Sequence, residues 1–412
     1  MASPGAAHGY RPLPYWQGNL LTAGAAYRNG LASLAREKFA FLSGRDDLPH
    51  VQRRMWIVTT SSLRSRRIAV PDAFAAIQDY YEAQGWTDGL PVVPATEDLV
   101  WEMLGTFGRD PAQNLGVIQP RNASVTLEKI AINAVMAGCR PEHFPVVVAA
   151  VRAIMQPAFN VAGCQATTGG AAPVIIVNGP LATELSINGD AGCFGPGYRA
   201  NAAIGRALRL VIRNLAGLIP GEMDKATLAT PGRYSFCFAE NEARSPWEPR
   251  HVELGFAASA SLVTLTAVRA VYPVMETTVA TGREVLQTLV ESIKTVGFAN
   301  YYQIGTGAQL TLVVCPEHAV EMAAAGLTKA DVRAYIFQEA RMPMRRLKGI
   351  AHYGNRNWPA WIDEHDPETL VPVVRCADDI VVVVAGGDGR HSAWLAGWGV
   401  TRVVTEEITT PS

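Results

Sequence analysis

The sequence of 412 residues is poor in charge, and its charges cancel. Asp, Glu, Lys and Arg make up only 18% of the residues, and 36 basic side chains balance 37 acidic ones. A chain without a basic excess has no general attraction for nucleic acid or for an anionic membrane surface. Apolar residues reach 49%, which is enough for a large core and excludes disorder as the main state.

Long apolar runs and paired cysteines are also missing. No run reaches the roughly 18 apolar residues of a membrane span, and the start of the chain has no apolar signal-peptide core. We therefore expect a cytoplasmic protein with no membrane partner. The six cysteines include no C-x-x-C pair, which excludes a zinc ribbon and a thioredoxin-type dithiol. Thiol chemistry would have to use single cysteines, such as Cys164 or Cys193.

Hydrophobic periodicity predicts a mixed α/β protein, with a central α+β region packed on a C-terminal α/β layer unit. Residues 1–70 are expected to form an N-terminal appendage, residues 71–254 the central region and residues 255–412 the C-terminal unit. No internal repeat is visible. The expected helices lie near 74–80, 127–138, 144–156, 200–215 and 284–296, and the expected strands near 174–177, 234–239, 262–268, 310–314 and 380–384.

A short strand that turns after Glu240 is expected to gather reactive side chains. Cys237, Glu240, Glu242 and His251 follow one another closely around a Ser-Pro-Trp turn. Carboxylates near an imidazole can act as general acid and base, and an imidazole can activate a thiol as a nucleophile. We expect the two glutamates and the histidine to line one pocket. The alternative is a buried structural cysteine with solvated glutamates. The expected substrate contacts of this block are Asn241 and Trp247.

The segment 194–206 is predicted to bind an anion. Gly195 and Gly197 precede a helix whose first N–H groups lack partners, and Arg199 adds a charged donor. The glycine spacing fits neither a Walker A nor a Rossmann motif. The alternative is a packing turn with solvated arginines. Further candidate contacts to the substrate are Asn201, Arg206 and, from an Asp-Gly turn, Asp88.

A second strand end carries a glycine-rich loop. The buried strand 380–384 runs into Gly386-Gly387-Asp388-Gly389, and open α/β sheets bind ligands at such ends. Asp388 and His391 could form an acid/base pair with Ser392 as a substrate contact, or the loop could be a simple turn. No cofactor is predicted. A metal ion would require His143, His251 and His391 to converge with carboxylates, and no local ligand spacing supports this.

Several blocks together resemble a known family. These are residues 88–94, 137–142, 178–180, 194–206, 237–247, 315–319 and 386–394. They are similar to long bacterial proteins with a UGSC-like domain, named after small selenoproteins that carry selenocysteine in a glycine-rich loop after a strand. In this chain the loop has no cysteine. The resemblance therefore implies the strand-loop-helix location of a site, and it does not imply selenol or thiol redox chemistry there.

These observations predict a cytoplasmic enzyme that acts on a small anionic or polarised substrate by addition, elimination or hydrolysis. Acid/base groups would do the chemistry, with Cys237 as a nucleophile. One alternative is a thiol-dependent oxidoreductase, and another is a non-catalytic ligand-binding or scaffold subunit. Apolar helices in a charge-poor chain predict a homo-oligomer or an oligomer with a homologous chain.

Overall fold

The computed structural model describes residues 63–105, 107, 110–278, 281–296, 301, 304–348 and 358–409. All of them belong to one compact unit, Thr60–Ser412. Most of the appendage expected at residues 1–70 therefore lies outside the described residues.

The described helices are α2 (Phe74–Ala83), α3 (Glu97–Gly105), α4 (Leu127–Met136), α5 (Phe144–Met155), α6 (Val161–Ala166), α7 (Pro180–Glu184), α8 (Arg199–Asn214), α9 (Arg250–Glu253), α10 (Gly282–Val296), α12 (Pro316–Ala324), α13 (Lys329–Glu339) and α14 (Met344–Lys348). The strands are β1 (Asn114–Ile118), β2 (Ala123–Thr126), β3 (Ala172–Asn178), β4 (Cys237–Ala239), β5 (Leu262–Met275), β6 (Leu310–Val314), β7 (Arg341–Pro343), β8 (Leu370–Pro372), β9 (Ile380–Val384), β10 (His391–Gly397) and β11 (Val404–Glu407). The mixed α/β class predicted from the sequence is confirmed.

One seven-stranded sheet organises the fold. Its order is β4-β3-β5-β10-β6-β9, with β11 beside β5. The pairs β3–β4 and β6–β9 are parallel, and the other pairs are antiparallel. Strands β3 and β4 come before residue 255 and the others follow it, so the division predicted at residue 254 passes between neighbouring strands of a single sheet.

The two ends of this sheet have the same topology. In each half the first strand pairs in parallel with the second and antiparallel with the third, and the third strands, β5 and β10, meet at the centre. The hydrogen bonds after the second strands also match. The Glu240 N–H donates to the Val177 carbonyl at 3.0 Å, and the Ala385 N–H donates to the Val314 carbonyl at 3.0 Å. The chain thus contains a structural repeat that its sequence does not display.

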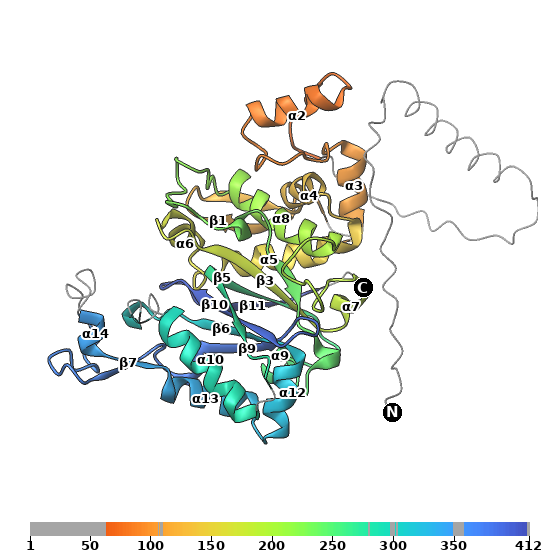
Figure 1. Cartoon of the computed structure of the whole chain (residues 1–412). Coiled ribbons are helices and arrows are strands. Elements are labelled where there is room, and N and C mark those ends of the chain that lie inside the picture. The colour runs from red at the N-terminus through yellow and green to blue at the C-terminus, as the bar shows by residue number, and fades with distance from the viewer. Residues whose placement is uncertain are drawn as a thin grey trace, which may run out of the picture. The chain divides into compact units, whose positions relative to one another are not determined.

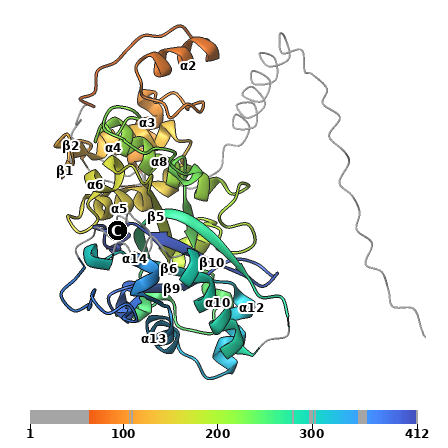
Figure 2. The same cartoon turned by 60° about the vertical axis from the view of Figure 1, so that its left-hand side comes forward.

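The sheet curls so that its two halves face each other. Alternate residues of β3, β4, β6 and β9, among them Ile176, Phe238 and Val383, form one small buried cluster. The opposite faces of the same strands pack against two helical layers (Figure 1), with α4, α5 and α8 on one side and α10, α12 and α13 on the other. The turned view in Figure 2 shows the same layering. The architecture is therefore helix, sheet, sheet, helix, with both sheet layers built from one sheet.

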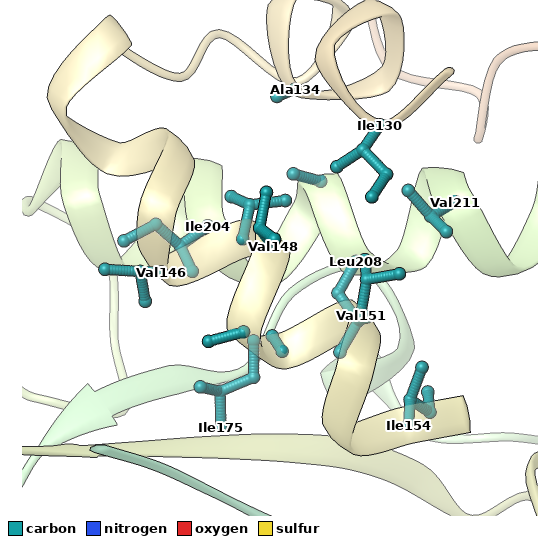
Figure 3. Close-up of a cluster of buried hydrophobic side chains, with 14 of the residues drawn as sticks. Ile130, Ala134, Val146, Val148, Val151, Ile154, Ile175, Ile204, Leu208 and Val211 are labelled. Carbon is teal, nitrogen blue, oxygen red and sulfur yellow. The ribbon is translucent and has the colours of Figure 1, made fainter. Parts of the chain in front are cut away.

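Three helices form the larger core because their apolar residues recur at helical spacing. Figure 3 shows side chains of α4, α5 and α8, such as Ile130, Val148 and Leu208, pointing toward one another above Ile175 of β3. The Thr126 side chain accepts a hydrogen bond from the Lys129 N–H and fixes the start of α4. This core holds the carboxyl end of β3 in place.

Two local expectations differ from the structure. Strand β5 continues to Met275, beyond the expected end near residue 268, because its second half pairs with β10. The glycine-rich loop 386–389 leads into strand β10, whereas the family resemblance implies a helix there. Residues 391–397 carry the hydrogen bonds of the sheet centre, which overrides any helical preference. Among the described residues, no helix is long and apolar enough to cross a membrane.

Candidate functional site

A cavity lies at the carboxyl ends of β3 and β4. Its volume is about 140 Å³, and residues 179–190 and 239–243 line it. Two glycines beside the cavity allow close backbone packing. A Cβ atom on Gly189 would overlap the Ala239 carbonyl, and a Cβ atom on Gly387 would lie 2.7 Å from the Ala191 Cβ. The Gly386 N–H donates to the Gly189 carbonyl at 2.8 Å. The glycines therefore bring the C-terminal loop against the rim of this cavity.

Glu240 is buried and fully engaged. Its side chain is 0% exposed, and Lys329 of α13 donates from Nζ to Oε1 at 3.1 Å. The Val384 N–H also donates to Oε1, while Oε2 accepts from Asn178 Nδ2 at 2.6 Å and from the Arg250 N–H at 2.9 Å. Four donors leave no room for a substrate proton. This bonding favours an internal ion-pair partner over the acid/base role predicted for Glu240 from the sequence.

Glu242 lies beside Glu240, and only one of its two carboxylate oxygens is hydrogen-bonded by the described residues. Its Oε1 accepts from the Gly179 N–H at 2.7 Å and from Asn178 Nδ2 at 3.2 Å. Its Oε2 makes no hydrogen bond within the described part of the chain. The side chain is 27% exposed and lines the cavity. One oxygen is thus fixed by the protein, and the other is available to a ligand.

His251 of α9 is placed against Glu242. The imidazole side chain is 2% exposed, and its Nδ1 lies 3.6 Å from Oε1 of Glu242. Its Nε2 faces the Ala258 carbonyl at 3.4 Å, and Nδ1 has no hydrogen-bond partner among the described residues. A carbonyl oxygen can only accept, so Nε2 carries a hydrogen. The sequence predicted that His251, Glu240 and Glu242 would line one pocket. Glu240 and Glu242 line the cavity, whereas His251 is buried against Glu242 and is not among the lining residues.

Two members of this cluster were missed by the sequence analysis. Asn178, the last residue of β3, joins the two glutamates through one amide nitrogen. Lys329 neutralises Glu240 and lies 3.8 Å from Glu253, which is also paired with Arg333. A polar residue at the end of the apolar run 174–177 was a usable signal for Asn178. Lys329 offered none, because it is distant in sequence and follows an ordinary helix cap.

The cysteines are poor nucleophiles in this structure. Cys237 is 3% exposed, and burial raises the pKa of its thiol well above the usual range. Burial likewise raises the pKa of Cys164 and of Cys193 to about 11. None of these thiols is ionised near neutral pH, and thiolate is the reactive form. The geometry therefore favours the structural alternative for Cys237 over the predicted nucleophile.

The predicted anion-binding groups bind other parts of the protein. Arg206 forms a two-pronged ion pair with Asp88 at 2.7 and 2.8 Å, and the two side chains are 14% and 13% exposed. Burial works to raise the pKa of Asp88, but the hydrogen bonds and charge of Arg206 outweigh it and lower that pKa. Arg199 is exposed and donates to the Gly138 carbonyl, and Asn201 is bonded to the backbone of Asn188. These contacts hold the segments around α8 together.

The glycine-rich loop holds its polar residues outside the cavity. Asp388 is exposed and pairs with Arg244, and His391 is exposed with Nδ1 2.5 Å from the Gly389 carbonyl. Ser392 is buried within the C-terminal half of the sheet. Of the other expected substrate contacts, Asn241 lines the cavity and donates to the Gly386 carbonyl at 3.3 Å. Trp247 is bonded through its indole N–H to the Leu327 carbonyl.

Metal binding has no geometric basis in the described ranges. No three His, Cys, Asp or Glu side chains there come together as metal ligands. His143 is buried at the start of α5, where its Nδ1 accepts from the Arg140 N–H at 3.2 Å. His143, His251 and His391 therefore do not form a ligand set with carboxylates in the described part of the chain.

Comparison with known proteins adds no name to this site. No protein-family model, no curated protein and no solved structure matches the chain. The geometry of the cavity is therefore the main guide to function.

Proposed function

We propose that the protein is a small-molecule enzyme whose active site is the cavity at the ends of β3 and β4, with Glu242 as its general acid/base. The observation that carries this proposal is the asymmetry of the Glu242 carboxylate. Gly179 and Asn178 hold one oxygen, and the other is unbonded in the described structure, with the side chain at the cavity wall. A fixed carboxylate with one free oxygen is suited to moving a proton to or from a bound substrate.

His251 is the proton partner of Glu242 in this proposal. With its hydrogen on Nε2, a neutral imidazole would direct the Nδ1 lone pair at a carboxylate oxygen 3.6 Å away, which is repulsive. A proton on Nδ1 would replace this repulsion by an attraction to the carboxylate. Glu242 can accept a proton through its free oxygen and later return it. Glu240, held by Lys329, keeps Asn178 and the Arg250 backbone in position.

The substrate we propose is a neutral or cationic molecule that donates hydrogen bonds. The charged residues that line the cavity are Asp190, Glu240 and Glu242, and none of its lining residues is Lys or Arg. Asp190 lies 3.7 Å from Arg244 and Glu240 is paired with Lys329, so Glu242 supplies the uncompensated negative charge. An anion would be repelled, so the anionic substrate expected from the sequence is replaced here. The volume of about 140 Å³ is below the roughly 300 Å³ at which cofactor-sized pockets begin. Small amides, lactams and amines fit this chemistry, with hydrolysis or elimination as the reaction.

The test first asks whether the purified full chain turns over any of a set of small amides, lactams and amines, with NMR as the assay. On any substrate that is turned over, we expect Glu242→Gln to lower kcat by at least about 100-fold, the usual contribution of a general base. The matched control is Glu291→Gln, which changes a surface glutamate paired with Lys294 on α10. Wild-type turnover by a folded Glu242→Gln protein would refute the proposed role.

A further inference from the structure

A second cavity lies among the N-terminal helices. It has a volume of about 710 Å³ and is lined by residues 63–70, by α2 and the start of α3, by one face of α4 and by the end of α8. It shares no lining residue with the cavity at the ends of β3 and β4. Its volume falls within the roughly 300–1,000 Å³ of pockets that bind drug-sized molecules.

The walls of this cavity are mostly apolar. Trp86 meets Tyr80 and Tyr81 edge-on, with ring centroids 6.1 and 6.0 Å apart, and the three rings form one wall. Aliphatic side chains of the core, including Ile132 and Met136 of α4, form another. Aromatic and aliphatic walls favour a ligand with an apolar body.

The charges inside the cavity are unequal once their partners are counted. Glu128 is 3% exposed, and its two oxygens accept from the N–H groups of Arg64 and Ser65 at 3.0 and 2.8 Å. Glu97 is paired with Arg67. Arg67 therefore compensates the charge of Glu97, whereas Glu128 accepts only from neutral backbone N–H groups and keeps its negative charge.

Two cations that line the cavity, Lys129 and Arg66, form no ion pair with the described residues. Lys129 donates from Nζ to the Ser124 carbonyl at 2.8 Å, which leaves two of its three N–H donors for a ligand. Arg66, also in the lining, is exposed and makes no ion pair with the described residues. The lining holds three cations, Arg66, Arg67 and Lys129, against the carboxylates of Glu97 and Glu128, so its net charge is +1.

We propose that this cavity binds an organic anion with an apolar body. Lys129 holds the acidic group, and the body of the ligand lies against the ring wall formed by Tyr80, Tyr81 and Trp86. Two straight-chain amphiphiles test this proposal directly, because decanoate and decylammonium have similar alkyl chains and head groups of opposite charge.

The experiment is calorimetric titration of the full chain with decanoate, decanol and decylammonium. We expect one decanoate site and no competition from decylammonium. Lys129→Met keeps the apolar stem but removes the charge, so it should weaken decanoate binding at least about tenfold, the lower end for a hydrogen bond to a charged group, and leave decanol binding unchanged. The matched control is Lys294→Met, which changes a lysine paired with Glu291 on α10.

Two cavity-filling variants locate the site. Ile132→Trp and Ala123→Phe each place an aromatic ring where a smaller side chain lines the cavity. Either variant should abolish decanoate binding while the protein still unfolds at the wild-type temperature. Equal binding of decylammonium would overturn the proposal. The absence of decanoate binding to folded wild-type protein would also overturn it. An affinity for decanoate that is unchanged both in Lys129→Met and in a folded cavity-filled variant would do the same.

Discussion

The two halves of the curled sheet share one topology but place different chemistry at their strand ends. The ends of β3 and β4 carry an ionic cluster, in which Asn178 bridges Glu240 and Glu242. At the end of β6, by contrast, Ser392 accepts from the Cys315 N–H at 3.1 Å and bonds to His318 at 2.8 Å. Equivalent backbone positions thus support a charged network in one half and a neutral one in the other. Topology sets where a site can form, and the side chains decide whether one does.

The two networks also differ in whether they are closed. His318 lies 3.0 Å through Nε2 from the Glu276 carbonyl, so Nε2 carries the hydrogen and Nδ1 accepts from the Ser392 hydroxyl. The groups that connect Cys315, His318 and Ser392 are all used, and the three residues are buried. In the N-terminal half, Glu242 keeps an oxygen at a cavity. A closed network stabilises the fold, whereas the open one can act on a ligand.

The largest expected effect comes from removing the cation of the ionic network. Lys329→Met leaves Glu240 buried without its charge partner, and breaking a buried ion pair in this way costs about 3–5 kcal/mol of unfolding free energy. Urea denaturation would measure it. Lys294→Met, at a surface ion pair, should cost less than about 1 kcal/mol.

The double variant sharpens this result. With Glu240→Gln added to Lys329→Met, no uncompensated charge remains, so part of the lost stability should return. If Lys329→Met were as stable as the wild type, the ionic network would contribute nothing to the fold, and the contrast between the two halves would fail.

A smaller effect is expected in the neutral network. Ser392→Ala removes a hydroxyl that serves both the Cys315 N–H and His318, and leaves them buried without it. An unsatisfied buried group costs about 1–3 kcal/mol, and denaturant midpoints would report the loss. A loss equal to that of Lys329→Met would show that the two networks are not energetically different.

The pH dependence of stability probes the neutral network of the C-terminal half. Burial lowers the pKa of His318, so the folded protein keeps the imidazole neutral where the unfolded chain, with an ordinary pKa of about 6.5, binds a proton. This part of the stability is present above about pH 6.5 and is lost as the pH falls toward the lowered value. We expect His318→Gln to flatten that decline in unfolding free energy. The exposed His365 is the control, and a His365→Gln protein should keep the wild-type slope.

The smallest effect is on thiol reactivity, where both halves should behave alike. Cys237 and Cys315 are buried, and burial raises the pKa of both thiols. Cys376 is exposed. Labelling of native protein with iodoacetamide, followed by mass spectrometry, should modify Cys376 first and leave Cys237 and Cys315 unmodified until unfolding. Rapid labelling of Cys237 in the native state would instead revive the thiol-dependent mechanism.

The strands of the parallel pairs were predictable because of their burial. Residues 310–314 and 380–384 were expected as strands and are β6 and β9. Strands covered on both faces appear as continuous apolar runs. Helix α8 was predictable for a similarly local reason, because its apolar residues recur at helical spacing. The start of α10 is also fixed locally, since Thr281 and Glu284 bond to each other's backbone N–H. The structural repeat was not visible, because pairing order leaves no mark on residue periodicity.

The sequence by itself determined the fold class, the positions of the ten helices and strands expected from it, and the proximity of Glu240, Glu242 and His251, since these depend on short-range patterns. The tertiary structure decided the role of each. Lys329 arrives from α13 to make Glu240 an internal ion-pair partner, and burial makes the Cys237 thiol inert. A role of this kind depends on which distant groups supply hydrogen bonds, charge and cover from water, and those neighbours are fixed only when the sheet curls and brings its two halves together.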